Sequence, residues 1–277
     1  MKLGDWHEFC HNCDMQKYLF LMVIAIYLWL TFNFWRKADN ANELLHTILL
    51  GIGLALHAWL LQNTLFYYSI NLSVTNALSA VLWLTILIYW LATLFKKNLQ
   101  ALQIFVLPVA AICVLVQVLV HDAHFLNYVY LPYFKAHVVV ALLAYGLFTF
   151  AAFHALLMRL AERKLHHQST WINLPNLPPL MPMEKLLFQA ITAGFILLTL
   201  TIVSGFLFSE EIFGSPMQMN HKNIFTLISW LIYATLLLGH YQLGWRGRRA
   251  TRLALAGFVS LLLAYMGSKF VLEILLK

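Results

Sequence analysis

The chain has 277 residues, of which 62% are hydrophobic and only 10% are charged. An ordinary soluble domain carries roughly 25% charged residues, so this composition excludes a soluble globular enzyme, a disordered chain and a nucleic-acid-binding module. The net charge of +7 does not imply an anionic partner, because the basic residues lie in short segments between long apolar runs. The direct partner that the composition predicts is the lipid bilayer.

Eight apolar runs are long enough to cross a bilayer, which takes about 20 helical residues. In chain order they cover residues 18–35, 44–62, 75–95, 101–120, 136–158, 186–208, 223–243 and 253–272. We therefore predict an all-α fold, a polytopic bundle of about eight transmembrane helices. Residues 1–17 are expected to form a polar N-terminal tail, and residues 18–277 a single transmembrane domain. The first run is expected to be an anchor rather than a cleaved signal, because a signal has a basic start and a shorter apolar core.

The basic residues alternate between the two ends of these runs. Two lie after the second, fourth and sixth runs, namely Lys135 and Lys222. Twelve lie after the first, third, fifth and seventh runs, namely Arg36, Lys37, Lys96, Lys97, Arg159, Arg163, Lys164, Lys185, Arg246, Arg248, Arg249 and Arg252. Because basic loops stay in the cytoplasm, both termini are predicted on the outer, periplasmic side. The cytoplasmic loop 159–185 contains four prolines and is predicted to be a stiff, extended connector.

Cysteine is sparse and concentrated in the tail. Cys10 and Cys13 form a C-x-x-C pair. We expect this pair to be dispensable for function, and the alternative is a redox role. The tail also contains Met15, so translation could start at either Met1 or Met15. Cys113 lies within the fourth run and is expected to be a small core residue.

Ionisable residues inside a membrane are costly and are therefore functional candidates. All eleven acidic residues lie outside the predicted spans or at their ends. This distribution argues against an ion-coupled carrier and removes carboxylate acid–base catalysis, so we expect that the protein is not an enzyme and has no catalytic residue. The ionisable residues within the spans are histidines, namely His46, His57, His137, His154 and His240.

Neutral imidazole is the usual axial ligand of heme iron, and heme requires an apolar pocket with aromatic walls. The aromatic content of 15% suits such a pocket. His57 and His137 are predicted at similar depth in the outer half of the membrane, whereas His240 lies near the cytoplasmic end. We therefore predict non-covalent heme with His137 and His57 as iron ligands on opposite faces, and His240 as a ligand of a second heme. The alternative is that these histidines only form hydrogen bonds between helices.

Helical spacing places each of these histidines on a face expected to point inward. His46, Gly53 and His57 align on one helix. In the run 136–158 the shared face consists of His137, Ala141, Ala144, Phe148, Ala151 and Ala155. In the run 223–243 and just before it, the shared face consists of Lys222, Ser229, Tyr233 and His240, with Thr226 close by. Weaker ligand candidates are His121, His124 and His221, at the predicted outer surface.

Four segments resemble the cytochrome c assembly protein family, in the manner of its CcsA/CcmC-like members. Residues 137–145 (HVVVALLAY) are similar to one histidine helix of that family. Residues 239–250 (GHYQLGWRGRRA) are similar to its second histidine helix and basic turn, and residues 264–270 (AYMGSKF) also fit. Residues 178–184 (PPLMPME) resemble the approach to the sixth span in the HemX/YpjD-type branch. The resemblance covers residues 100–277 well and the first three spans only by their layout.

The resemblance implies a multi-pass protein of the bacterial inner membrane that handles heme in cytochrome c assembly. It implies roles for His137 and His240 and partners among cytochrome c maturation or heme-biosynthesis proteins. Heme-presenting members carry a tryptophan-rich outer loop, whereas residues 209–222 contain no tryptophan. The alternative function is therefore a non-catalytic, HemX-like regulator or scaffold of tetrapyrrole metabolism that does not itself carry heme.

Overall fold

The structure is a computed structural model, and it describes residues 3–36, 43–66, 71, 73–95, 100–120, 132–167, 179–213 and 220–267. Nearly all of these residues lie in helices, with no strand among them, which confirms the all-α prediction. The helices are α1 (Leu3–Arg36), α2 (Glu43–Phe66), α3 (Val74–Phe95), α4 (Gln100–Leu119), α5 (Pro132–His167), α6 (Leu180–Phe213), α7 (His221–Leu243) and α8 (Gly247–Leu262), followed by the π-helical turn η1 (Leu263–Gly267).

Six of the described helices, namely α1, α2, α3, α5, α6 and α7, are long and apolar enough to cross a membrane. The apolar stretch of α4, Phe105–Leu119, is shorter than these. Part of the predicted eighth span, residues 268–272, lies outside the described residues. The chain is thus a multi-pass helical membrane protein, while the number of eight spans and the outer position of both termini stay predictions.

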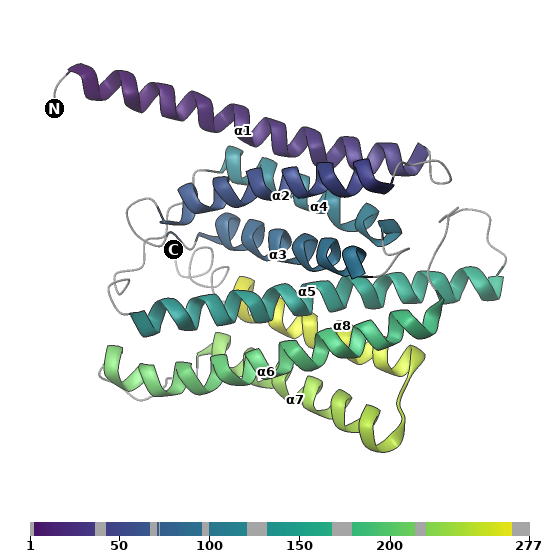
Figure 1. Ribbon diagram of the computed structural model, residues 1–277. Helices are drawn as coiled ribbons and strands as arrows, with labels where there is room; N and C mark the ends of the chain where they lie inside the picture. The colour runs from purple at the N-terminus through teal and green to yellow at the C-terminus, as the bar shows by residue number, and fades with distance from the viewer. Residues whose placement is uncertain are drawn as a thin grey trace. The chain divides into compact units, whose positions relative to one another are not determined.

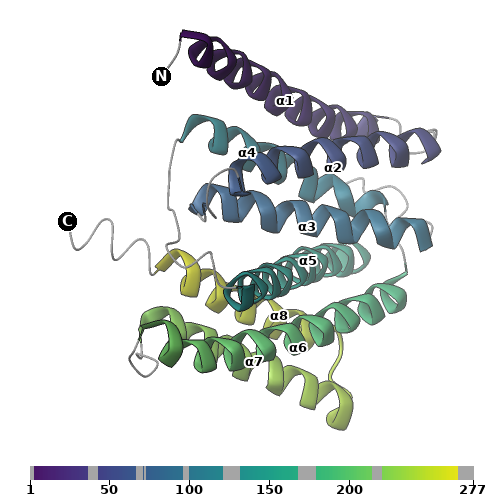
Figure 2. The same cartoon turned by 60° about the vertical axis from the view of Figure 1, so that its left-hand side comes forward.

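The helices fall into two compact units, unit 1 (Met1–Asn127) and unit 2 (Tyr128–Lys277). In unit 1 the contacts form a closed cycle, in which α1 packs on α2 and α4, and α3 packs on α2 and α4 (Figure 1). In unit 2 a second cycle joins α5, α6, α7 and α8 in chain order, and α8 closes it on α5 (Figure 2). A single domain over residues 18–277 stays a prediction.

Several helices extend beyond the apolar runs that predicted them. The apolar run 136–158 lies within the longer helix α5, and the run 186–208 lies within α6. The prediction of an extended connector over residues 159–185 was therefore wrong at both ends, since the described parts, 159–167 and 180–185, are helical. Pro182 is tolerated because it lies in the first turn of α6, where the backbone N–H has no partner within the helix.

Within unit 1, two tryptophans of α3 form hydrogen bonds to α2. The indole Nε1 of Trp83 donates to the carbonyl of Leu54 at 2.9 Å, and that of Trp90 donates to the carbonyl of Thr47 at 2.9 Å. Gly51 makes the second approach close, because a Cβ there would lie 3.1 Å from the Trp90 ring. Such contacts give each indole N–H a partner where the membrane offers none.

The predicted inward face of α7 is confirmed by the burial of its two central polar residues. Ser229 and Tyr233 are fully buried, and their hydroxyls donate to the carbonyls of Gly257 and Ala254 on α8 at 2.9 and 3.2 Å. The Tyr233 ring also stacks on Phe148 of α5, with ring centroids 4.0 Å apart. The middle of α7 is therefore a packing surface rather than part of an open site.

Candidate functional site

His57 is buried inside unit 1 with both ring nitrogens bonded. Its Nδ1 lies 3.1 Å from the hydroxyl of Tyr27 on α1, and its Nε2 lies 2.9 Å from the hydroxyl of Ser79 on α3. The exposed fractions of the three side chains are 1%, 0% and 0%. One nitrogen donates and the other accepts, so both are occupied, and iron ligation by His57 would require one hydrogen bond to be given up.

His137 is arranged differently, because one of its ring nitrogens is left for another partner. Its Nδ1 lies 2.8 Å from the hydroxyl oxygen of Ser204 on α6. That hydroxyl also lies within donating distance of the carbonyls of Leu200 and Thr201, at 2.7 and 3.2 Å, and when it donates its only hydrogen to one of them it accepts a hydrogen from Nδ1 of the histidine. Nδ1 then carries the proton and Nε2 carries the lone pair. Among the described residues no group bonds this Nε2.

One side of the His137 ring faces a small residue of α6. Gly205 follows Ser204 on α6, and a Cβ at that glycine would lie 3.3 Å from Cε1 of the His137 ring. The inward face predicted for this helix is confirmed further along α5, where four residues are fully buried, namely Ala144, Phe148, Ala151 and Ala155.

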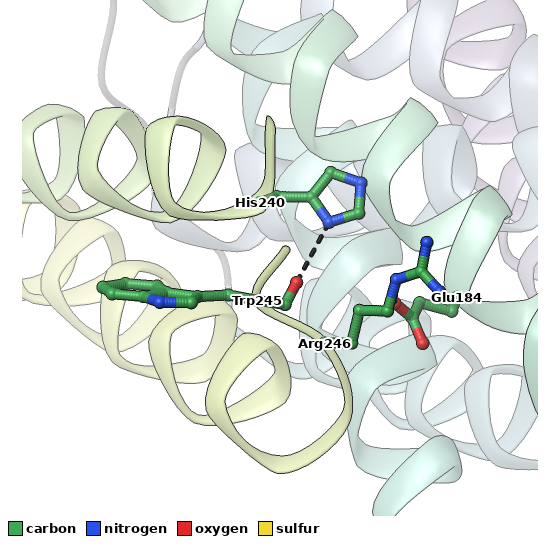
Figure 3. Close-up of polar contacts among 4 residues, drawn as sticks. All are labelled: Glu184, His240, Trp245 and Arg246. Carbon is green, nitrogen blue, oxygen red and sulfur yellow. Dashed lines mark hydrogen bonds and ion pairs between the residues drawn. The ribbon is translucent and has the colours of Figure 1, made fainter. Parts of the chain in front are cut away.

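His240 lies at the other end of unit 2, in the last turn of α7. There the chain turns back toward the helix it has just left. Helix α7 ends at Leu243 and is capped by Gly244, whose left-handed conformation (φ 65°) only glycine adopts easily. The turn brings the Trp245 carbonyl within 3.0 Å of Nδ1 of His240, as Figure 3 shows. A carbonyl only accepts, so Nδ1 carries the proton and Nε2 again carries the lone pair. No described residue bonds this Nε2 either.

The His240 turn is fixed by stacking and by ion pairs. The His240 ring stacks on Phe188 of α6, with centroids 3.4 Å apart and planes 13° from parallel. The guanidinium of Arg246 faces Glu184 of α6 at 3.6 Å, as Figure 3 shows. That of Arg248 lies 3.8 Å from Glu162 of α5. The basic turn is thus attached to the two helices that precede α7, and the His240 ring is held in one orientation.

His137 and His240 are too far apart to hold one iron. Their contacts on α6, Ser204 and Phe188, are separated by roughly 16 residues, which is about 24 Å at 1.5 Å rise per residue. The prediction that His240 could serve only a second heme agrees with this separation. His57 belongs to unit 1 and His137 to unit 2, so their pairing on one heme stays a prediction.

The remaining histidines contribute less to a site. His154 is buried, bonds the Met183 carbonyl through Nε2 at 2.9 Å and stacks on Phe150, as expected for a packing residue. His46 is also buried, on the same face of α2 as His57. His221 is exposed at the start of α7. His121 and His124 lie outside the described residues.

The donor set among the described residues suits a metal held in a macrocycle rather than a bare ion. No group of three or more histidine, cysteine or carboxylate side chains is close enough within these ranges to hold a metal. A porphyrin supplies four nitrogens itself and needs only one or two protein ligands. A single imidazole with its Nδ1–H held by a protein acceptor and its Nε2 free is the form in which histidine binds iron. His137 and His240 both fit heme in this respect.

Sequence reasoning did not predict the residues that orient these two imidazoles. Ser204 and Phe188 lie on a different helix, and no local pattern links them to their histidines. The Trp245 carbonyl could have been predicted, because Gly244 soon after His240 is a typical helix C-cap that returns the chain toward the last turn.

The described part of the chain is thus a polytopic helical membrane protein with two histidines whose Nε2 atoms are oriented and available. The model of the family described as Cytochrome C assembly protein matches residues 46–276, and the chain belongs to this family. It is 34% identical over 144 residues to the Inner membrane protein YpjD of Escherichia coli strain K12, covering 52% of this chain and 54% of that protein. It is 37% identical over 92 residues to the Cytochrome c biogenesis protein CcsA of Prochlorococcus marinus strain MIT 9303, covering 33% and 29% respectively. The chain spans about half the length of the first of these relatives and less than a third of the second.

Proposed function

We propose that this protein binds heme in the bacterial inner membrane and handles it for cytochrome c assembly, with His137 as an axial ligand. The observation that carries the proposal is the hydrogen bond from Nδ1 of His137 to Ser204, whose own hydrogen is donated to Leu200. When the Ser204 hydroxyl donates to a carbonyl, this pair of bonds supports the tautomer with the proton on Nδ1 and the electron pair on Nε2. Membership of the cytochrome C assembly protein family and the names of the two relatives support the same role.

The protein's own residues would bind and orient heme rather than catalyse a reaction. Heme, when bound, supplies the iron and the group that is later joined to an apocytochrome. Ser204 holds the His137 ring in one orientation. The protein is accordingly proposed to be a biogenesis factor that works with other cytochrome c maturation or heme-biosynthesis proteins, without a catalytic residue of its own.

The three candidate ligands differ in whether a ring nitrogen is left unbonded to coordinate iron. His137 and His240 each present an unprotonated Nε2, whereas both nitrogens of His57 are bonded to buried hydroxyls. We therefore place the first heme at His137 and a second, separate one at His240. His57 can be the second axial ligand of the heme at His137 only if it breaks its hydrogen bond to Tyr27 or to Ser79. Unit 1 would also have to bring His57 to that heme.

The test is a heme titration of the purified, detergent-solubilised protein, followed by absorption spectroscopy. Wild type should develop a Soret band shifted from that of free heme, and His137→Ala should weaken or alter that band most. His221→Ala is the matched control, because this histidine is exposed in the first turn of α7 beside Lys222 and should leave the spectrum unchanged. A wild-type protein that leaves the heme spectrum unchanged, or a His137→Ala variant identical to wild type, would refute the proposal.

A second function remains supported by two observations. Both ring nitrogens of His57 are bonded, as suits a purely structural histidine. Residues 209–222 lack the tryptophans of heme-presenting members. These features favour a membrane regulator or scaffold of tetrapyrrole metabolism that carries no heme. Deleting the gene distinguishes the two functions. Loss of covalent cytochrome c at normal total heme supports heme handling, and changed total heme at a normal proportion of cytochrome c supports the regulator.

A further inference from the structure

The described stretch 246–252 contains four exposed arginines, here called the arginine cluster, namely Arg246, Arg248, Arg249 and Arg252. Arg246 pairs through its Nε with Glu184 of α6 at 3.6 Å, as Figure 3 shows. Arg248 pairs through its Nε with Glu162 of α5 at 3.8 Å. The side chains of these two arginines still keep 65% and 66% of their surface exposed. The ion pairs therefore fix the backbone of the turn, while its outward surface stays basic.

The helical period places the cluster on the outward face of α8. Arg248, Arg249 and Arg252 lie within about 100° of one another around the helix axis. The opposite face is buried and contains Ala250, Thr251 and Ala254. Helix α8 packs against α5 and α7. The three arginines thus lie on the side of α8 that is turned away from the rest of unit 2.

The outward face of α8 changes from basic to apolar along the helix. Arg252, Ala256, Val259 and Leu263 are spaced by four, three and four residues, so they form one stripe. All four side chains are exposed, and after Arg252 the stripe is apolar. In a membrane protein such a change marks the boundary between headgroups and hydrocarbon. The stripe offers a charge for a lipid headgroup and, directly beyond it, apolar side chains for an acyl chain.

We propose that the arginine cluster binds the phosphate of an anionic phospholipid, whose acyl chains lie along the apolar part of this stripe. A guanidinium group can bind two phosphate oxygens with parallel hydrogen bonds, which gives arginine an advantage over lysine in this role. A zwitterionic headgroup also carries an ammonium group, which the cluster repels, so the site prefers lipids with a net negative charge. The inference is independent of the proposed function, because no arginine of the cluster is a candidate iron ligand.

The residues to replace are Arg249 and Arg252, because the ion pairs that attach the turn to α5 and α6 use the other two arginines. Lys135 is the matched control for the loss of one positive charge. It is exposed on α5, roughly 27 residues before Glu162, which is about 40 Å away at 1.5 Å rise per residue. Lys135→Gln therefore lowers the net charge as Arg252→Gln does, at the opposite end of unit 2.

The experiment measures the binding of phosphatidylglycerol and phosphatidylcholine with matched acyl chains to the detergent-solubilised protein, by native mass spectrometry. Wild type should bind phosphatidylglycerol more tightly. Arg252→Gln should bind it about fivefold more weakly, and Arg249→Gln with Arg252→Gln about 25-fold more weakly, with unchanged affinity for phosphatidylcholine. Replacing the same two arginines with lysine should retain part of the affinity, since the charge remains. Lys135→Gln should match wild type for both lipids.

Four outcomes would overturn the inference. Equal affinity of wild type for the two lipids would mean that the cluster does not select a charged headgroup. Unchanged phosphatidylglycerol affinity in the double glutamine variant would assign the arginines to another occupant, such as an acidic protein surface. Displacement of the lipid by inorganic phosphate at equal concentration would mean that only an ion is recognised. Equal loss of both lipids in the glutamine and lysine variants would mean that the substitutions only disturb the fold.

Discussion

The hydrogen bonds of His57 predict that this residue stabilises unit 1 whether or not it ever binds iron. Replacing it with alanine removes a ring that joins α1, α2 and α3 through Tyr27 and Ser79. Both partners are fully buried, and neither of the two side-chain hydroxyls has another hydrogen bond among the described residues. The His57→Ala variant therefore leaves two hydroxyls without partners in an apolar interior, together with a cavity.

The expected cost can be estimated from these parts. A hydrogen bond between membrane helices is worth about 0.6–2 kcal/mol, so the two bonds account for about 1–4 kcal/mol. Truncating a large buried side chain to alanine costs a further 2 kcal/mol or so. We expect His57→Ala to lower the free energy of unfolding by about 3–6 kcal/mol, and Tyr27→Phe and Ser79→Ala to lower it by about 1 kcal/mol each.

The assay is equilibrium unfolding in mixed micelles, followed by circular dichroism. Trp59→Ala is the control on the same helix, since Trp59 is 60% exposed on the outside of unit 1 and should matter little to its interior. In the His57→Ala background, Tyr27→Phe should have almost no further effect, because its partner is already gone. A His57→Ala variant as stable as Trp59→Ala, or full additivity with Tyr27→Phe, would refute the reasoning.

Three further predictions concern unit 2 and the chain end. A Cβ at Gly257 would lie 2.8 Å from the Tyr233 ring, so Gly257→Ala should destabilise the protein by about 1–2 kcal/mol in the same unfolding assay, despite the better helix propensity of alanine. A Cβ at Gly239 would overlap the Trp245 ring, so Gly239→Ala should displace that indole and shift its fluorescence, and an unshifted emission would contradict the geometry of the turn. An alkaline phosphatase fused after Lys277 should be active, because the basic residues predict an outer C-terminus, and activity of a cytoplasmic reporter there instead would reverse the topology.

The existence and order of the helices could be predicted from the sequence, but their ends could not. Hydrophobicity reports the part of a helix that lies in lipid, whereas a helix ends where capping and packing end it. Helix α5 therefore continues past the apolar run to His167, and α6 begins at Leu180, before its apolar run. The prolines that suggested an extended connector do not prevent this, because Pro182 falls in a first turn.

The faces of the helices were predictable for the same reason, while the partners on them were not. The 3.6-residue period placed Ser229 and Tyr233 inward, and both are buried. Period alone cannot distinguish a histidine with two bonded nitrogens, such as His57, from one with a free nitrogen, such as His137. That difference depends on single hydroxyls of other helices, Ser79 and Ser204, whose positions are set by tertiary packing.

Helix α6 touches both available imidazoles of unit 2, Phe188 against His240 and Ser204 against His137. No proline interrupts the helix between these two contacts, so this stretch behaves as a stiff rod. A small slide or rotation of α6 would loosen the stacking at one end and the serine contact at the other in the same movement. The two contacts lie about 24 Å apart along the helix, so they change together only when α6 moves as a unit.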